Sequence, residues 1–171
     1  LAGPARCVLR YLEAVRLAPG DVAFDGSWTV DAGKLAPAHI VVRSLLKDVA
    51  EFHAVRLRTA AGGKVVRLAV APGTVATKAA PEIDRQAYRL QVADGAIDIT
   101  GNSDQGLFYG VQTLVQLLKR DESGRLLLPK GTIDDWPKLQ LRFLHWDTKH
   151  HQDRMETLKR YLDWSARFKV N

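Results

Sequence analysis

Residues 86–120 constrain the fold most strongly, because an alternating stretch is followed at once by a helical one. Apolar residues alternate with polar ones on both sides of the dipeptide Asp94-Gly95: Tyr88, Leu90, Val92, Ile97 and Ile99. Alternation with a period of two predicts strands that bury one face. Asp-Gly between two such runs predicts a hairpin with a type I′ turn, which requires positive φ at both central residues.

A helix is predicted to follow over residues 103–120, with two glycines inside it. Asn102 can cap its first turn, and Gln105, three residues later, can reach back. Each of Gly106 and Gly110 costs about 1 kcal/mol relative to alanine inside a helix. Close approach of the helix backbone to a sheet or to another helix offsets that cost. We therefore expect Gly106 and Gly110 to have a structural role in packing.

The remaining pattern predicts further elements in this order: short strands over 14–17 and 22–30, a helix over 37–52, a strand over 64–70, a loop over 72–85 and a strand over 126–128. Asp25-Gly26 is a hairpin signal inside the second of these strands. An apolar strand over 139–146 and a helix from about 153 to 168 follow, with Asp153 and Glu156 as the helix cap. This order predicts an α+β fold: an antiparallel sheet with two helices packed on one face, then a single βα unit.

Charge and composition argue against two classes of partner. The formal net charge is +6, but basic residues are scattered and often neighbour acidic ones, as in Lys47–Asp48–Glu51. A phosphate backbone requires a gathered basic face, so we expect no nucleic-acid partner. No apolar run approaches the roughly 20 residues that span a bilayer, so no membrane partner is expected. Cys7 is alone and cannot form an internal disulfide, and no export-signal pattern opens the sequence.

Three segments together resemble glycoside hydrolase family 20, the β-N-acetylhexosaminidases. "AYRLQVADGAIDITGNSDQGLFYGVQTLVQLL" resembles the end of the accessory domain that precedes the family's catalytic barrel. "GTIDDWPKLQLRFLHWDT" resembles the entry into the (β/α)8 barrel, usually I-x-D-x-P-x-x-x-x-R-G-x-x-x-D, and "METLKRYLDWSARFKVN" resembles the first barrel helix. The resemblance implies an accessory domain over residues 1–137 and the start of a truncated (β/α)8 barrel over residues 138–171.

The resemblance also implies a mechanism whose catalytic residues lie outside this chain. In this family the acetamido oxygen of the sugar attacks the anomeric carbon, an Asp orients that group, and the adjacent Glu protonates the leaving oxygen. That Asp-Glu pair belongs to the fourth barrel strand, and a complete barrel takes about 250 residues. We therefore expect no catalytic residue here and no activity of the chain alone. The expected partners are the missing barrel and a glycan; no cofactor is implied, and a secreted or periplasmic location is expected by analogy.

Three positions match the motif of the barrel entry. Arg142 matches the family's strand-one arginine, which grips sugar hydroxyls, so it is the candidate substrate-binding residue. The family usually has glycine after it, whereas this sequence has Phe143. Asp147 matches the strand-end acid and is expected to order a loop. Asp135 matches the acid before the aromatic-Pro pair; with Asp134 it is expected in a turn or linker, because adjacent extended residues point oppositely.

Residues His145, Asp147, His150 and His151 raise the alternative of a metal site. Alternate residues on a strand share a face, so His145 and Asp147 could converge. Structural zinc sites, however, favour cysteine-rich sets with tight spacings, and these four residues do not supply one. We therefore expect no metal.

Two further functional interpretations stay open at this stage. The accessory domain of an α-glucuronidase also precedes a barrel, and "LHWD" is similar to the barrel entry of those enzymes. A free carbohydrate-binding module would need an exposed row of aromatic residues. The four tryptophans show no periodic row, and most of them are expected to be core or domain-contact residues: Trp28, Trp136, Trp146 and Trp164.

Overall fold

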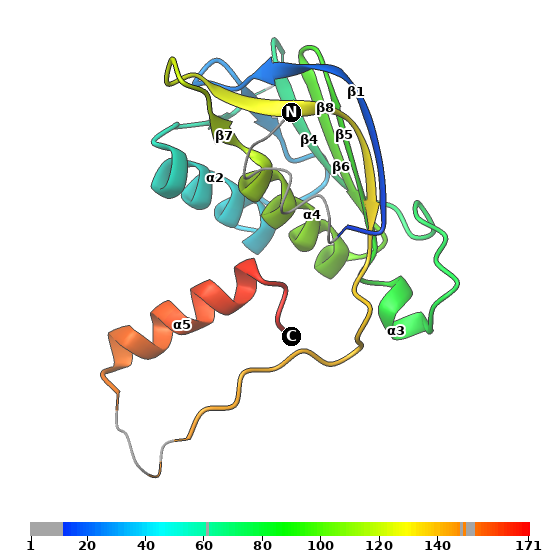
Figure 1. Ribbon diagram of the computed structural model, residues 1–171, viewed down its shortest axis with the longest axis vertical. Coiled ribbons are helices and arrows are strands. Elements are labelled where there is room, and N and C mark those ends of the chain that lie inside the picture. Colours follow the sequence, from blue (N-terminus) through cyan, green and yellow to red (C-terminus); the bar gives the residue numbers. More distant parts are fainter. Residues whose placement is uncertain (1–11, 61, 148, 150–152) are drawn as a thin grey trace.

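The computed structural model describes residues 12–60, 62–147, 149 and 153–171. One twisted sheet forms the top of the molecule as drawn in Figure 1, and two long helices, α2 (Ile40–His53) and α4 (Asp104–Leu117), cover one of its faces. A third long helix, α5 (Met155–Arg167), lies beyond them on the side away from the sheet. We call residues 12–137 the sheet region and residues 138–171 the C-terminal segment.

The sheet contains eight described strands in the order β1-β8-β5-β6-β4-β2-β3, with β7 also paired to β8. Their bounds are as follows: β1 Ala14–Ala23, β2 Thr29–Asp31, β3 Arg58–Thr59, β4 Val65–Val70, β5 Tyr88–Ala93, β6 Ala96–Gly101, β7 Lys119–Arg120 and β8 Leu126–Asp135. A four-residue helix, α3 (Pro81–Asp84), interrupts the predicted loop between β4 and β5. The fold class is therefore α+β, as the order of elements predicted.

The expected antiparallel sheet is a mixed sheet. β1, β5 and β7 pair antiparallel with β8, and β5 pairs antiparallel with β6. β2 is parallel to both β3 and β4, and β4 is parallel to β6. A parallel pair needs a long crossover, which α2 supplies between β2 and β3. The hairpin β5–β6 places β6 between β5 and β4 in the sheet.

One of the two predicted hairpins forms, with a different turn. Ala93 pairs with Ala96 across Asp94-Gly95, as the alternation required. Gly95 has φ of 76°, but Asp94 has no positive φ, so the turn is not type I′. Asp25-Gly26 joins β1 to β2 without making a hairpin, because β1 pairs with β8 whereas β2 pairs with β3 and β4.

Both long helices of the sheet region, α2 and α4, begin later than the sequence predicted. α2 begins at Ile40, and the ring of His39 accepts a hydrogen bond from the Val41 amide. The cap of α4 is Ser103, whose Oγ accepts from the Gly106 amide.

The side chain of Asn102, the expected cap of α4, has another role. It is buried and joins the β4–β5 loop to the start of α4. It accepts from the Val75 amide at 3.1 Å and donates to the carbonyl oxygens of Val75 and Asp84. Because the Asn102 side chain is bonded to the β4–β5 loop and α3, it does not cap α4.

The apolar core lies between the sheet and the two helices. Its fully buried large side chains come from both layers: Phe24, Trp28, Leu45, Tyr88, Leu90, Ile97, Ile99, Leu107, Leu114, Leu117, Leu118 and Leu128. Trp28 stacks on Phe24, with ring centroids 5.4 Å apart, so this tryptophan is a core residue as expected.

The C-terminal segment differs from its predicted form. Residues 138–147 form no strand, because no described strand lies beside them to complete a hydrogen-bond ladder. The N-cap of α5 is Arg154, and no side chain caps the helix, so the expected Asp153–Glu156 cap is not made. α5 ends at Arg167, close to the predicted position, and none of its residues is buried. None of the described helices has both the length and the apolar character required to cross a bilayer.

Candidate functional site

The candidate site lies where the C-terminal segment meets the sheet region. The side chain of Arg142, the expected sugar-binding residue, folds back toward the sheet region. Its Nη2 donates to Gln86 Oε1 at 2.8 Å and to the hydroxyl of Tyr109 at 2.9 Å. Its Nε donates to the Lys169 carbonyl at 2.6 Å, and its Nη1 donates to the Leu139 carbonyl. These contacts use four of the five guanidinium hydrogens and leave one, on Nη1, without a partner among the described residues.

Asp135 lies at the end of β8, not in a turn or linker as expected, and its carboxylate is buried. Its Oδ2 accepts from the Lys169 ammonium at 2.7 Å and from the Tyr88 hydroxyl at 2.8 Å. Lys169 also donates to the Tyr88 oxygen at 2.9 Å, and Tyr88 shares a short hydrogen bond with Thr113 of α4. We call Lys169, Asp135, Tyr88 and Thr113 the Lys169 anchor.

Burial shifts the pKa of two members of the Lys169 anchor, Lys169 and Tyr88. It lowers the pKa of Lys169 against the opposing effect of the Asp135 carboxylate. The pKa of Tyr88 is raised well above its usual value, first by burial and then by the negative charge of Asp135. Tyr88 therefore stays a neutral hydroxyl, which can donate to the carboxylate and accept from the ammonium at the same time.

The left-handed backbone of Lys169 brings its side chain to the sheet region. α5 ends at Arg167, Lys169 has φ of 57°, and the Val170 amide donates back to the Ser165 carbonyl. This is a helix C-terminal turn of the kind that usually carries glycine. The sequence offered no signal for Lys169, because neither a motif nor a periodic pattern marks this position.

The neighbouring Asp134 points to the opposite side of β8, as expected for adjacent residues of an extended chain. It accepts from Arg89 at 2.6 Å and from Arg16 at 3.0 Å, and so ties β5, β8 and β1 together. Burial alone would raise the pKa of Asp134, but the hydrogen bonds from Arg89 and Arg16 outweigh that effect and lower it. The two aspartates therefore form no catalytic pair.

The only Asp-Glu dipeptide in the sequence, Asp121-Glu122, belongs to the turn between β7 and β8. Asp121 accepts from the backbone and hydroxyl of Ser123 and from Arg125. These contacts, foremost the Ser123 hydroxyl, lower the pKa of Asp121 to about 2. A fully ionised turn residue of this kind is suited to ordering the turn and not to proton transfer.

Gly106 and Gly110 face the sheet at the closest approach of α4. A Cβ on Gly106 would overlap the Ala87 carbonyl, and one on Gly110 would lie 2.5 Å from Ile99 Cγ2 and 3.0 Å from the Tyr88 ring. The close approach that the two glycines predicted is therefore present. The absent side chain at Gly110 also leaves the space in which the Tyr88 ring lies.

Asp147 accepts a hydrogen bond from the Lys149 amide at 2.8 Å, which closes a local turn. His145 is exposed. His150 and His151, the other members of the considered metal cluster, lie outside the described residues. Within the described part of the chain, no three His, Cys, Asp or Glu side chains are arranged to hold a metal ion.

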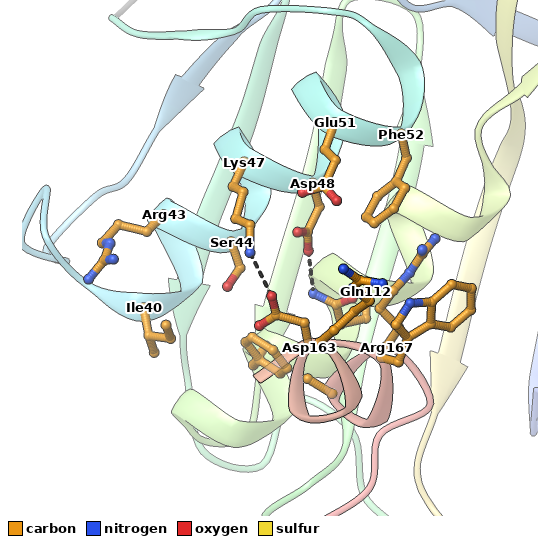
Figure 2. A pocket seen from close by; sticks show the side chains of 14 residues that line it. Ile40, Arg43, Ser44, Lys47, Asp48, Glu51, Phe52, Gln112, Asp163 and Arg167 are labelled. Carbon is orange, nitrogen blue, oxygen red and sulfur yellow. Dashed lines mark hydrogen bonds and ion pairs between the residues drawn. The ribbon is translucent and has the colours of Figure 1, made fainter. Parts of the chain in front are cut away.

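A polar cavity of about 310 Å³ separates α5 from α2 and α4, and Figure 2 shows its lining. Polar contacts line it: Lys47 of α2 donates to Asp163 of α5 at 2.9 Å, and Gln112 of α4 donates to Asp48 of α2 at 3.0 Å. Burial raises the pKa of Asp48, and the Gln112 hydrogen bond only partly opposes this. The cavity is therefore a polar gap between the C-terminal segment and the helices, bridged by the exposed Lys47–Asp163 pair.

Comparison with known proteins identifies the sheet region. The sequence profile of glycosyl hydrolase family 20, domain 2, matches residues 11–136. The chain is 33% identical over 100 residues to a β-hexosaminidase of Vibrio vulnificus and 34% identical over 95 residues to one of Porphyromonas gingivalis. These matches cover 58% and 52% of this chain but only 12% of each relative.

A solved structure extends the similarity to nearly the whole chain. The structure of a mutant Streptomyces plicatus β-hexosaminidase in complex with its product GlcNAc superposes with a TM-score of 0.77 and 26% identity. That match covers 99% of this chain and 34% of the Streptomyces chain. With the family profile matching 11–136, the chain belongs to glycoside hydrolase family 20, of which it contains domain 2.

Proposed function

We propose that the whole protein is a β-N-acetylhexosaminidase-like glycosidase that hydrolyses terminal N-acetylhexosamine residues. The match of the family profile to residues 11–136 carries this proposal, and both β-hexosaminidase relatives support it. Within that enzyme, residues 1–137 form the accessory domain and residues 138–171 begin the catalytic barrel.

We infer that the chain alone does not hydrolyse glycosides. The substrate-assisted mechanism of the family needs an Asp-Glu pair beside the sugar, and Asp121-Glu122 lies in an exposed turn of the sheet region. Asp134 and Asp135 are engaged with arginine and lysine side chains on opposite sides of β8. The catalytic carboxylates are therefore assigned to the part of the enzyme beyond this sequence.

The exposed apolar side chains of the C-terminal segment support its assignment to a barrel. They come from both halves of the segment: Leu139, Leu141, Phe143, Leu144, Met155, Tyr161, Leu162, Trp164 and Phe168. One βα unit of a (β/α)8 barrel has neither the adjacent strands nor the adjacent helices that bury such residues. The remaining seven units would supply them.

For Arg142 we propose contact with the glycan in the whole enzyme. Hydrogen bonds to Gln86, Tyr109 and the Lys169 carbonyl hold its guanidinium in place. One Nη1 hydrogen remains for a sugar hydroxyl. An arginine already held in place loses little side-chain entropy on binding a ligand. Phe143 replaces the glycine usual in the family and is exposed, so it adds apolar surface beside Arg142.

The deciding experiment measures release of p-nitrophenol from p-nitrophenyl N-acetyl-β-glucosaminide by the whole protein and by residues 1–171. The whole protein is expected to turn the substrate over, and the 171-residue chain is expected to be inactive. Steady turnover by the pure 171-residue chain would refute the assignment of catalysis to the missing part. An inactive but folded whole protein would refute the glycosidase proposal.

One observation favours a second candidate, glycan binding by α5. Trp164 is 51% exposed and stacks with Phe168, the ring centroids being 6.2 Å apart, which offers a small aromatic surface. The Arg167 guanidinium lies over both Trp164 and Phe52, so part of this surface already joins α5 to α2. Titration of the 171-residue chain with N-acetylglucosamine oligomers tests this role, and a fluorescence change that Trp164→Ala removes would establish it.

A further inference from the structure

The backbone and side chain of Lys169 link two separate contacts between the C-terminal segment and the sheet region. Its ammonium contacts Asp135 and Tyr88, and its carbonyl oxygen accepts a hydrogen bond from Arg142. A displacement of this one residue therefore disturbs both contacts.

The ammonium of Lys169 is held in a closed environment. The Lys169 side chain is 17% exposed and that of Asp135 is 6% exposed, and the ammonium also lies 4.9 Å from the centre of the Tyr88 ring. The Tyr88 hydroxyl and the Glu13 amide satisfy further acceptor positions of Asp135. Breaking a buried pair by removal of one partner leaves an uncompensated charge, so this pair favours one position of the segment strongly.

The carbonyl of Lys169 lies on the other side of the same residue, where Arg142 approaches. Arg142 also donates to Gln86 and Tyr109 of the sheet region. Its guanidinium is therefore held both by the C-terminal segment and by the sheet region. With the left-handed φ of 57° at Lys169, the ammonium contacts Asp135 while the carbonyl oxygen faces Arg142.

We propose that Lys169 is a positioning residue for Arg142: its pairing with Asp135 fixes the end of α5 on the accessory domain and thereby sets the guanidinium for the glycan. The part of this inference that concerns the glycan rests on the proposed function. The accessory domain then contributes to substrate binding through Asp135, Tyr88, Gln86 and Tyr109 without touching the sugar. Apolar packing cannot replace the anchor, because α5 buries no residue of its own.

The first test measures opening of the C-terminal segment in the 171-residue chain by limited chymotrypsin digestion. The exposed Phe143 and Leu144 provide cleavage sites, which mass spectrometry identifies. Lys169→Met and Asp135→Asn are each expected to accelerate cleavage at these sites by roughly tenfold or more, since each leaves a buried charge unpaired. Lys159 is an exposed lysine of α5, so Lys159→Met is the matched control and is expected to leave the rate unchanged.

The double variant Lys169→Met/Asp135→Asn separates pairing from simple loss of contact. It removes both charges, so it is expected to be cleaved more slowly than either single variant. Cleavage of the single variants at the rate of Lys159→Met would refute the anchor. Unchanged thermal melting of the sheet region, followed by far-ultraviolet circular dichroism, shows that the variants remain folded.

Lys169→Gly separates the anchor from the helix-capping role of this position. Glycine suits the left-handed backbone but has no ammonium. The anchor predicts fast cleavage for Lys169→Gly, as for Lys169→Met. Protection of Lys169→Gly equal to that of the unmodified chain would show that only the backbone turn matters, and would overturn the proposal.

The second test uses the whole enzyme and p-nitrophenyl N-acetyl-β-glucosaminide. Lys169→Met is expected to raise KM several-fold with a much smaller change in kcat, because a displaced Arg142 loses ground-state and transition-state contacts alike. Tyr109→Phe, which removes one acceptor of Arg142, is expected to raise KM less. Unchanged KM in Lys169→Met would refute the link from Lys169 to Arg142. An inactive unmodified enzyme would refute the proposed function, while the digestion result would still decide the anchor.

Discussion

The sheet region and the C-terminal segment are held in place by different forces. The sheet region has a continuous apolar core, in which Leu45 of α2 and Leu90 of β5 are fully buried. The C-terminal segment buries none of the residues of α5, and large apolar side chains such as Leu162 are exposed. It is held by hydrogen bonds and ion pairs, the most buried of them at Lys169. The sheet region therefore specifies its own fold, whereas the segment takes its position from the surface on which it docks.

The largest expected effect comes from truncating one leucine in each region. Leu45→Ala removes a fully buried side chain from the core and is expected to lower the free energy of unfolding by about 2–5 kcal/mol. Leu162→Ala, on the exposed face of α5, is expected to change it by less than about 0.5 kcal/mol. Urea denaturation followed by circular dichroism measures both. A loss for Leu162→Ala as large as for Leu45→Ala would contradict the view that only the sheet region is held by an apolar core.

The next effect tests whether the close approach of α4 supports both regions. Gly110→Leu places a side chain against Ile99 and Tyr88, and is expected to lower the free energy of unfolding by about 1–3 kcal/mol through overpacking. Gly26→Ala is the control, because an added Cβ there lies no closer than 3.7 Å to its nearest neighbour, the Arg56 carbonyl. Because Tyr88 belongs to the Lys169 anchor, Gly110→Leu should also accelerate cleavage of the C-terminal segment. Unchanged stability would contradict the packing role of Gly110.

A smaller effect concerns the pH dependence of the sheet region. The pKa of Asp134 is lower in the folded than in the unfolded chain, so its stabilising contribution is complete above the unfolded value near 3.8. That contribution is lost as pH falls through the lowered folded pKa. Asp134→Asn is expected to reduce the free energy of unfolding at pH 7 by on the order of 1 kcal/mol. It should also flatten the acid dependence below about pH 4; an unaltered acid profile would rule out this role.

The smallest effect is expected from an exposed pair that bridges the two regions. Lys47 and Asp163 are more than half exposed, so Lys47→Ala is expected to change the free energy of unfolding by at most about 0.5 kcal/mol. The chymotrypsin cleavage rate in the C-terminal segment should rise slightly at low salt and not at all at 1 M salt, where charges are screened. If Lys47→Ala raised the cleavage rate as much as Lys169→Met, the main attachment of the segment would be at α2 and not at Lys169.

The sequence predicted the local elements of the sheet region well where burial has a clear period. Alternation around Asp94-Gly95 predicted the β5–β6 hairpin, and the helical spacing of apolar residues predicted α2 and α4 to within a few residues. The two glycines of α4 predicted its close packing on the sheet. Helix caps were less predictable, because Asn102 and Ser103 are both good caps and only the position of the β4–β5 loop selects between them.

Local sequence patterns therefore specify the set of elements, their buried faces and the family to which their combination is similar. The mixed strand directions, the acceptors around Arg142 and the pairing of Lys169 with Asp135, residues 34 positions apart, depend on the folded arrangement. The physical reason is that hydrophobic periodicity records which face of an element is buried, but not which partner lies against it. A buried ion pair or a strand direction depends on where distant parts of the chain meet, and no local pattern encodes that.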